Sequence, residues 1–117
     1  MAAPNIVNVA TITGKTAVQA VSTSATAIVT NSAGSGKVFK VNALYVANID
    51  GTVAADITVD LYRSATAYPI ASTISVPADA TLDLVSKPLY LEEGDVLRCT
   101  ASAAGDLTAV CSYEEIS

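Results

Sequence analysis

The sequence has no histidine and no tryptophan, and it holds only two cysteines and one phenylalanine among its 117 residues. Histidine is the side chain that most often moves protons near neutral pH, and it is the commonest metal ligand. Without it, none of the serines has an imidazole to activate it, and no motif supports a lysine-dependent substitute. These absences argue against catalysis and predict neither a cofactor nor a metal site.

Charge of either sign is also sparse. Charged residues make up 15% of the chain and hydrophobic residues 51%, a balance that excludes a disordered chain. The net charge is −5 and the six basic residues are scattered, which argues against nucleic acid as a partner. The apolar runs are only a few residues long, whereas a membrane-spanning helix needs about 20. The first residues lack the basic and apolar regions of a secretory signal, so we expect synthesis in the cytoplasm.

What the sequence does have is alternation. In residues 55–63, Ile57, Val59 and Leu61 alternate with polar side chains, as in a half-buried β-strand. Similar short segments recur between turns, and no segment shows a sustained helical apolar stripe. The sequence therefore predicts an all-β fold: a single-domain antiparallel β-sandwich, jelly-roll or Ig-like, with about eight or nine strands.

Nine strands are expected, within residues 5–13, 17–21, 25–30, 37–49, 55–63, 68–76, 81–86, 96–102 and 107–115, while residues 88–91 lead into the turn of residues 92–95. We expect a turn at Gly14-Lys15 to end the first, so that residues 1–14 form an N-terminal strand or interaction arm and residues 15–117 the sandwich. Residues 37–49 are apolar on both faces, which predicts a central strand. Pro69 predicts an edge strand or an irregular start. The last two segments are expected to form a hairpin.

Three polar groupings deserve comparison with known sites, and each is better explained as structure. Residues 34–37, Gly-Ser-Gly-Lys, resemble a phosphate-binding loop but precede a strand instead of a helix, which predicts a flexible turn. Asp56 and Asp60 share a strand face, yet four residues along a strand span about 13 Å, too far for a paired-carboxylate mechanism. Residues 92–95, Glu-Glu-Gly-Asp, favour a solvated turn over a calcium loop.

Cys99 and Cys111 are the only cysteines. If the last hairpin turns around Gly105, these residues lie opposite one another, and a disulfide is geometrically conceivable. The alternative is a pair of small buried hydrophobic residues, since free cysteine is among the most buried residue types. Assembly in the cytoplasm favours reduced thiols.

The candidate interface residues are tyrosines and the apolar N-terminal segment. Tyr62, Tyr68, Tyr90 and Tyr113 are expected to be exposed, and packing in the core or at a subunit interface is favoured over a sugar-stacking platform because tryptophan is absent. In the N-terminal segment, Ile6, Val7 and Val9 either add a strand to a neighbouring subunit or form an ordinary first strand.

Four segments, residues 3–16, 31–42, 59–64 and 90–95, resemble small virion structural proteins of tailed phages, especially those of marine cyanobacteria. The resemblance covers nearly the whole chain and lies in its overall pattern. It implies a non-enzymatic component of the virion, first of all a multi-copy capsid decoration protein that braces the shell by contacts with the major capsid protein. A homo-oligomer, preferably a trimer, would suit this role. The alternative is a tail, neck or fibre component involved in adsorption to the host surface.

Overall fold

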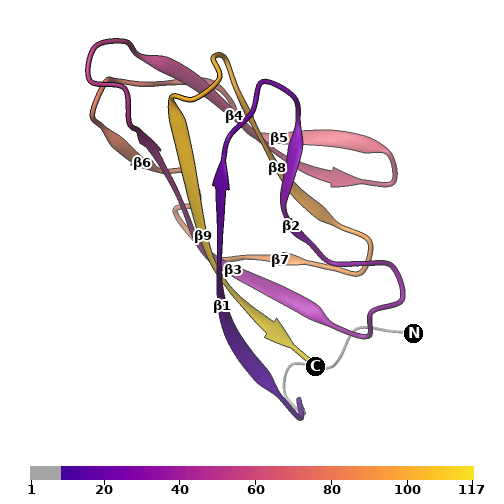
Figure 1. Cartoon of the computed structure of the whole chain (residues 1–117). Helices are drawn as coiled ribbons and strands as arrows, with labels where there is room; N and C mark the ends of the chain where they lie inside the picture. Colours follow the sequence, from indigo (N-terminus) through magenta and orange to yellow (C-terminus); the bar gives the residue numbers. More distant parts are fainter. Residues whose placement is uncertain (1–8) are drawn as a thin grey trace.

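The computed structural model describes residues 9–117, and within them it consists of strands and connecting loops without any helix. No helix in that range could therefore cross a membrane. The strands, shown in Figure 1, are β1 (Ile12–Ala20), β2 (Thr26–Thr30), β3 (Val38–Asn48), β4 (Ala55–Arg63), β5 (Thr66–Val76), β6 (Thr81–Asp83), β7 (Leu89–Leu91), β8 (Val96–Ala101) and β9 (Leu107–Ile116). The all-β antiparallel sandwich that the sequence predicts is confirmed.

Two sheets face one another. Sheet A has the order β1-β9-β3-β6, with β7 also pairing with β3, and sheet B has the order β2-β8-β4-β5. Six of the eight connections carry the chain from one sheet to the other, and the resulting strand order is that of a jelly roll. Among the described strands, β4 and β5 are the only consecutive pair that hydrogen-bond to each other. The molecule measures 49 × 26 × 19 Å along its principal axes.

The final hairpin expected from the sequence is wrong. β8 pairs with β2 and β4 in sheet B, whereas β9 pairs with β1 and β3 in sheet A. The turn around Gly105, whose φ is +82°, carries the chain across the sandwich. A turn-forming sequence shows where the chain reverses, but it does not show whether the next strand pairs with the last one or crosses to the other layer.

The expected turn at Gly14-Lys15 is also wrong. β1 passes through both residues because β9 supplies an antiparallel partner for each of its positions, from Ile12 opposite Ile116 to Ala20 opposite Thr108. The sandwich therefore includes residues 12–14, which were expected to belong to a separate N-terminal strand or arm. Residues 5–8 of the expected first strand lie outside the described residues.

The core lies between the inner faces of the two sheets. β3 is central in sheet A, as expected, but only one of its faces forms the core. A register shift between Val41 and Ala43 moves the buried positions from Phe39 and Val41 to Leu44 and Val46. The shift explains why the sequence pattern looked apolar on both faces, because a β-bulge inverts the alternation. The core is completed largely by Ile57, Val59, Leu97, Cys99, Leu107, Ala109 and Cys111.

Candidate functional site

Three of the carboxylates that the sequence singled out, those of Asp60, Glu92 and Asp95, form ion pairs with arginines of the chain. The Arg63 side chain donates from Nε to Asp95 Oδ1 at 2.7 Å and from Nη2 to Glu92 Oε2 at 2.8 Å. The carboxylate of Asp95 is buried, and its Oδ2 also accepts the Glu92 backbone N–H at 2.8 Å. Burial by itself raises the pKa of Asp95, but the bonds from Arg63 and Glu92 outweigh it and hold that pKa below its ordinary value.

The loop of residues 31–36 and the turn of residues 92–95 are joined to each other by hydrogen bonds. Asn31 is fully buried, and its Nδ2 donates to the carbonyl oxygens of Lys37 and Leu91, each at 2.9 Å. The backbone N–H of Gly94, a residue with φ of +90°, donates to Asn31 O at 2.7 Å. Gly36 N–H donates to Glu93 Oε2 at 3.0 Å. The resemblance to a phosphate loop or a calcium loop is thus explained by structural contacts, and residues 9–117 contain no cluster of metal-ligating side chains.

Asp56 and Asp60 do not act together. Asp60 is buried and accepts two bonds from Arg98, at 2.9 Å from Nε and 3.3 Å from Nη2. The Arg98 guanidinium lies 4.0 Å from the centre of the Tyr62 ring, so Tyr62 is half-buried beneath it and not fully exposed as expected. The hydrogen bond to Asp60 is the main cause that raises the pKa of Arg98.

A shallow depression of about 190 Å³ lies on sheet B. Most of its exposed surface is carbon, although five of its six lining residues, Asp56, Thr58, Thr73, Thr100, Ala101 and Ser102, carry a hydroxyl or a carboxylate. Two of the hydroxyls are already used, because Thr58 Oγ1 accepts Thr73 N–H at 3.0 Å and Ser102 Oγ accepts Asp56 N–H at 2.8 Å. The depression can form hydrogen bonds with a small polar group, but it contains neither a nucleophile–base pair nor a second carboxylate.

Cys99 and Cys111 face the core from opposite sheets and are free, buried thiols. Burial raises the pKa of Cys99 to about 12, with smaller contributions from Cys111 and Asp60, and raises that of Cys111 to about 11. A cysteine reacts as its thiolate, so both side chains are poor nucleophiles.

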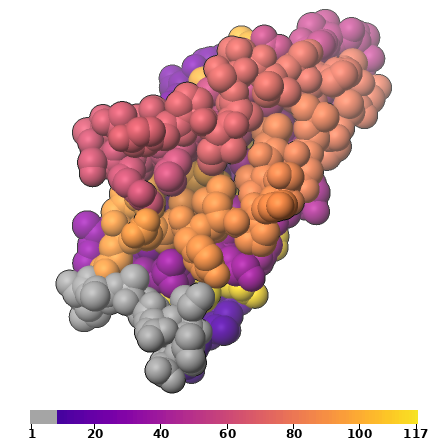
Figure 2. Space-filling view, turned by 180° about the vertical axis from the view of Figure 1, so that it is seen from behind, coloured from indigo at the N-terminus to yellow at the C-terminus, as the bar shows by residue number. Residues whose placement is uncertain are grey.

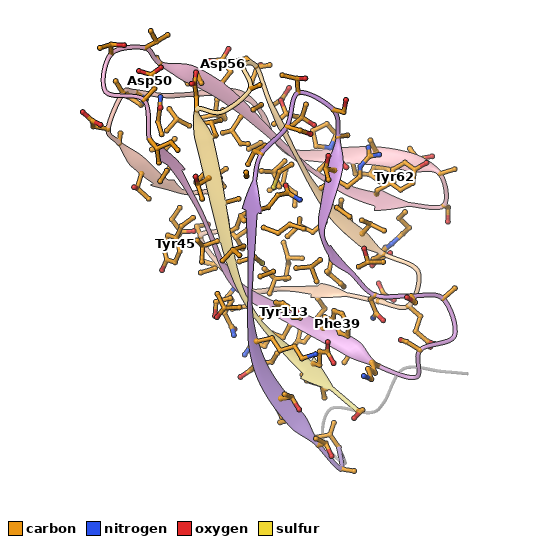
Figure 3. All side chains as sticks on the ribbon, viewed as in Figure 1. Phe39, Tyr45, Asp50, Asp56, Tyr62 and Tyr113 are labelled. Carbon is orange, nitrogen blue, oxygen red and sulfur yellow. The ribbon has the colours of Figure 1, made fainter. Side chains whose placement is uncertain are left out.

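The remaining candidates are exposed apolar side chains, which gather on two surfaces. On the outer face of sheet A, Val18 is 73% exposed and Tyr45 is 45% exposed. Val110 of β9 lies between them, paired with Val18 on one side and with Tyr45 on the other. We call these three residues the sheet A patch; Figure 3 shows Tyr45 pointing away from the sandwich. The patch could not be recognised from the sequence, because Tyr45 alternates in phase with Phe39 and Val41 when the β3 bulge is not known.

The second surface lies on the β4–β5 hairpin. Tyr68 is 54% exposed and Ile74 is 40% exposed, and they lie opposite Leu61 and Ile57 on the face of sheet B that points toward the core. Leu61 and Ala71 on the same face are half-buried and contact the core. We call Leu61, Tyr68, Ala71 and Ile74 the β5 shelf. In Figure 2 this hairpin stands out from the body of the molecule as a separate ridge.

The other predicted interface residues differ in their surroundings. Tyr90 on β7 is 43% exposed. Tyr113 is half-buried, with its ring centre 5.6 Å from that of Phe39 (Figure 3). Val9 is half-buried and precedes β1, whose start is held by bonds from Ala10 and Thr11 N–H to Ser117 O. Ile6 and Val7 lie outside the described residues.

Comparison with known proteins identifies a similar fold but no family. No family model and no curated protein matches the chain. A similar solved structure is a chain from the work titled "Bacillus endospore appendages form a novel family of disulfide-linked pili". It is 17% identical, covers 92% of this chain and 88% of its own, and superposes with a TM-score of 0.53. At that identity the likeness shows a shared β-sandwich fold.

Proposed function

We propose that the protein is a non-enzymatic structural subunit that works by docking to other protein surfaces, as a multi-copy decoration protein on the capsid of a tailed phage. The observation that carries the docking role is the contrast between its polar and apolar groups. The buried carboxylates among the candidate reactive groups, Asp60 and Asp95, are bound by arginines of the chain, whereas large apolar side chains such as Tyr68 and Val18 are exposed. Exposed apolar patches on a rigid domain are typical of protein–protein contacts.

The virion setting rests on the sequence resemblance described above. A stiff jelly roll with few long side chains suits a protein that braces a shell, because ordering its surface on docking costs little rotamer entropy. The major capsid protein is the partner we propose, together with further copies of this chain. The expected site of action is the virion, after synthesis in the host cytoplasm.

The solved neighbour comes from an appendage described as disulfide-linked pili, which supports a structural role and association between copies. The disulfide part does not transfer. The only two cysteines of the chain, Cys99 and Cys111, are buried, so neither can reach a neighbouring molecule while the fold is intact. Association between copies is therefore proposed to be non-covalent.

A second candidate, a tail, neck or fibre component that binds the host surface, is favoured by one observation. The depression on sheet B presents the Asp56 carboxylate beside several hydroxyl groups, a set that can hydrogen-bond a hydroxyl-rich surface.

Copy number separates these proposals. Phage particles are purified, heads are separated from tails, and the chain is quantified in each fraction against the major capsid protein. Decoration predicts hundreds of copies on heads. A handful of copies confined to tails would contradict decoration and support adsorption, and absence from both fractions would contradict a virion role.

A further inference from the structure

The β5 shelf is a piece of sandwich interior that the second sheet does not cover. A β-sheet needs one apolar face packed against another layer. β5 is 11 residues long, whereas the strands at the corresponding edge of sheet A, β6 and β7, have three residues each. Sheet A is therefore too short at this edge to cover β5. Tyr68 and Ile74 stay exposed although their pairing partners, Leu61 and Ile57, belong to the inner face.

The shelf also lacks charge. Residues 64–78 contain no charged side chain, although the chain as a whole has a net charge of −5. Copies of an acidic protein repel one another, so they approach most easily through a surface free of charge. Exposed apolar groups and the absence of like charges are also what a self-complementary interface requires, since the same patch must face itself.

Backbone pairing along β5 is a poor alternative. Pro69 removes one N–H donor, and the register of β4 with β5 shifts on both sides of Val59. Thr73, a β-branched residue, has φ of +47°. Prolines and bulges of this kind protect edge strands from the addition of further strands. A second protein surface can therefore bind β5 through the apolar side chains of the shelf more easily than through its backbone.

We propose that the β5 shelf is the interface between two copies of this chain, packed face to face about a two-fold axis. Each shelf then supplies the layer that the other lacks, and Leu61 and Ala71 connect the interface to the core of each copy. This inference rests on the proposed docking function and replaces the trimer expected from the sequence with a dimer.

Sedimentation equilibrium of the full chain across the micromolar range tests the proposal, with Tyr68→Lys and Ile74→Lys as shelf variants and Val18→Lys as the matched control. The control adds the same charge to the most exposed residue of the sheet A patch. Each shelf variant introduces two like charges into a two-fold interface. We expect a dimer for the wild type and the control, and at least about a 100-fold increase in the dissociation constant for each shelf variant.

Circular dichroism and urea midpoints establish that the variants are folded, which their exposed positions favour. A monomeric wild type at all concentrations would overturn the proposal and would leave the shelf to a different protein. Loss of the dimer in Val18→Lys but not in the shelf variants would also overturn it and would place the interface on sheet A. Neither result changes the copy number per particle, so failure here is distinguishable from failure of the proposed function.

Discussion

Two buried asparagines hold the loops at the ends of the sandwich. Asn31 joins the β2–β3 loop to β7 by its bonds to Lys37 O and Leu91 O. Asn48 does the same elsewhere, with Nδ2 donating to Val53 O and Val76 O at 2.9 Å each. In each case one of the two bonds, to Leu91 O or to Val76 O, is buried, where a carbonyl without a partner is costly.

Replacing Asn31 by alanine should therefore destabilise the protein by about 2 to 4 kcal/mol, because two carbonyl groups lose their donors. Urea denaturation measures the change, with Asn42→Ala as the control at a partly exposed asparagine of the β3 bulge. An equal effect of the two substitutions would show that the Asn31 bonds contribute nothing specific.

Because of Asp95, we expect the free energy of unfolding to decrease at acidic pH. Its pKa in the folded protein is below the ordinary value of 3.8, so its stabilising effect is complete above that value and is lost as the pH falls through the folded pKa. Asp95→Asn should reduce the free energy of unfolding by about 2 kcal/mol at pH 7, since it weakens charged hydrogen bonds. The difference from wild type should shrink as the pH falls below about 4.

Urea denaturation of both proteins between pH 7 and pH 2 provides the comparison. Glu115, whose pKa is also lowered by its bonds to Lys15 and Lys37 despite burial, acts in the same direction and is present in both proteins. Curves that stay parallel down to pH 2 would mean that Asp95 is not responsible.

The buried thiols give a third prediction at this scale. At pH 8, Cys99 and Cys111 should react with a thiol reagent only after unfolding, because burial raises the pKa of each thiol and blocks access to it. The native protein should show no rapid reaction, and protein unfolded without reductant should show two thiols. A count of zero after unfolding would reveal a disulfide between them.

At the scale of elements, the agreement between sequence and structure is closest where a strand has one buried face and regular pairing. β4 covers residues 55–63, as expected from the alternation of Ile57, Val59 and Leu61. The expectation for Pro69 is confirmed, since β5 is the edge of sheet B. Such segments can be identified from sequence because local alternation and burial coincide.

The failures have a different physical cause. The continuation of β1 through Gly14-Lys15 depends on its partner β9, nearly a hundred residues away, and on the ion pair of Lys15 Nζ with Glu115 Oε2 at 3.0 Å. Which residues of β3 face the core depends on a β-bulge, and no residue near the bulge predicts it from the sequence. The hairpin turn at Ser64-Ala65 has positive φ at both residues without glycine or asparagine. Pairing between strands distant in sequence decided the first two features, whereas the turn joins the neighbouring strands β4 and β5 and lacks the usual turn residues.

Thr73 permits a test of strain within β5. Its φ of +47° is unfavourable for a β-branched residue, and glycine at this position removes the strain while keeping the backbone bond to Thr58 Oγ1. We expect Thr73→Gly to raise the free energy of unfolding by about 0.5 kcal/mol or more, because relief of about 1–2 kcal/mol exceeds the entropic cost of glycine.

The neighbouring Ser72→Gly is the control. Ser72 is also exposed but is not among the residues with positive φ, so glycine there should destabilise by about 0.5–1 kcal/mol. Urea midpoints measured side by side should move in opposite directions. Destabilisation of similar size in both variants would exclude stored strain at Thr73.

At the scale of the whole molecule, the candidate surfaces were only partly accessible from sequence. Tyr68 and Tyr90 were identified because exposed tyrosines are typical of interfaces, and both are exposed. Tyr62 was expected to be exposed but is half-buried, because Arg98 from another strand covers its ring. The β5 shelf could not be foreseen, since it results from the unequal lengths of β5 and the facing strands β6 and β7.

Imaging of the intact phage particle at a resolution that places this jelly roll is the decisive test of a decoration role. We expect many copies on the outer surface of the head, each contacting other proteins through exposed apolar side chains. Heads that lack this domain would exclude capsid decoration.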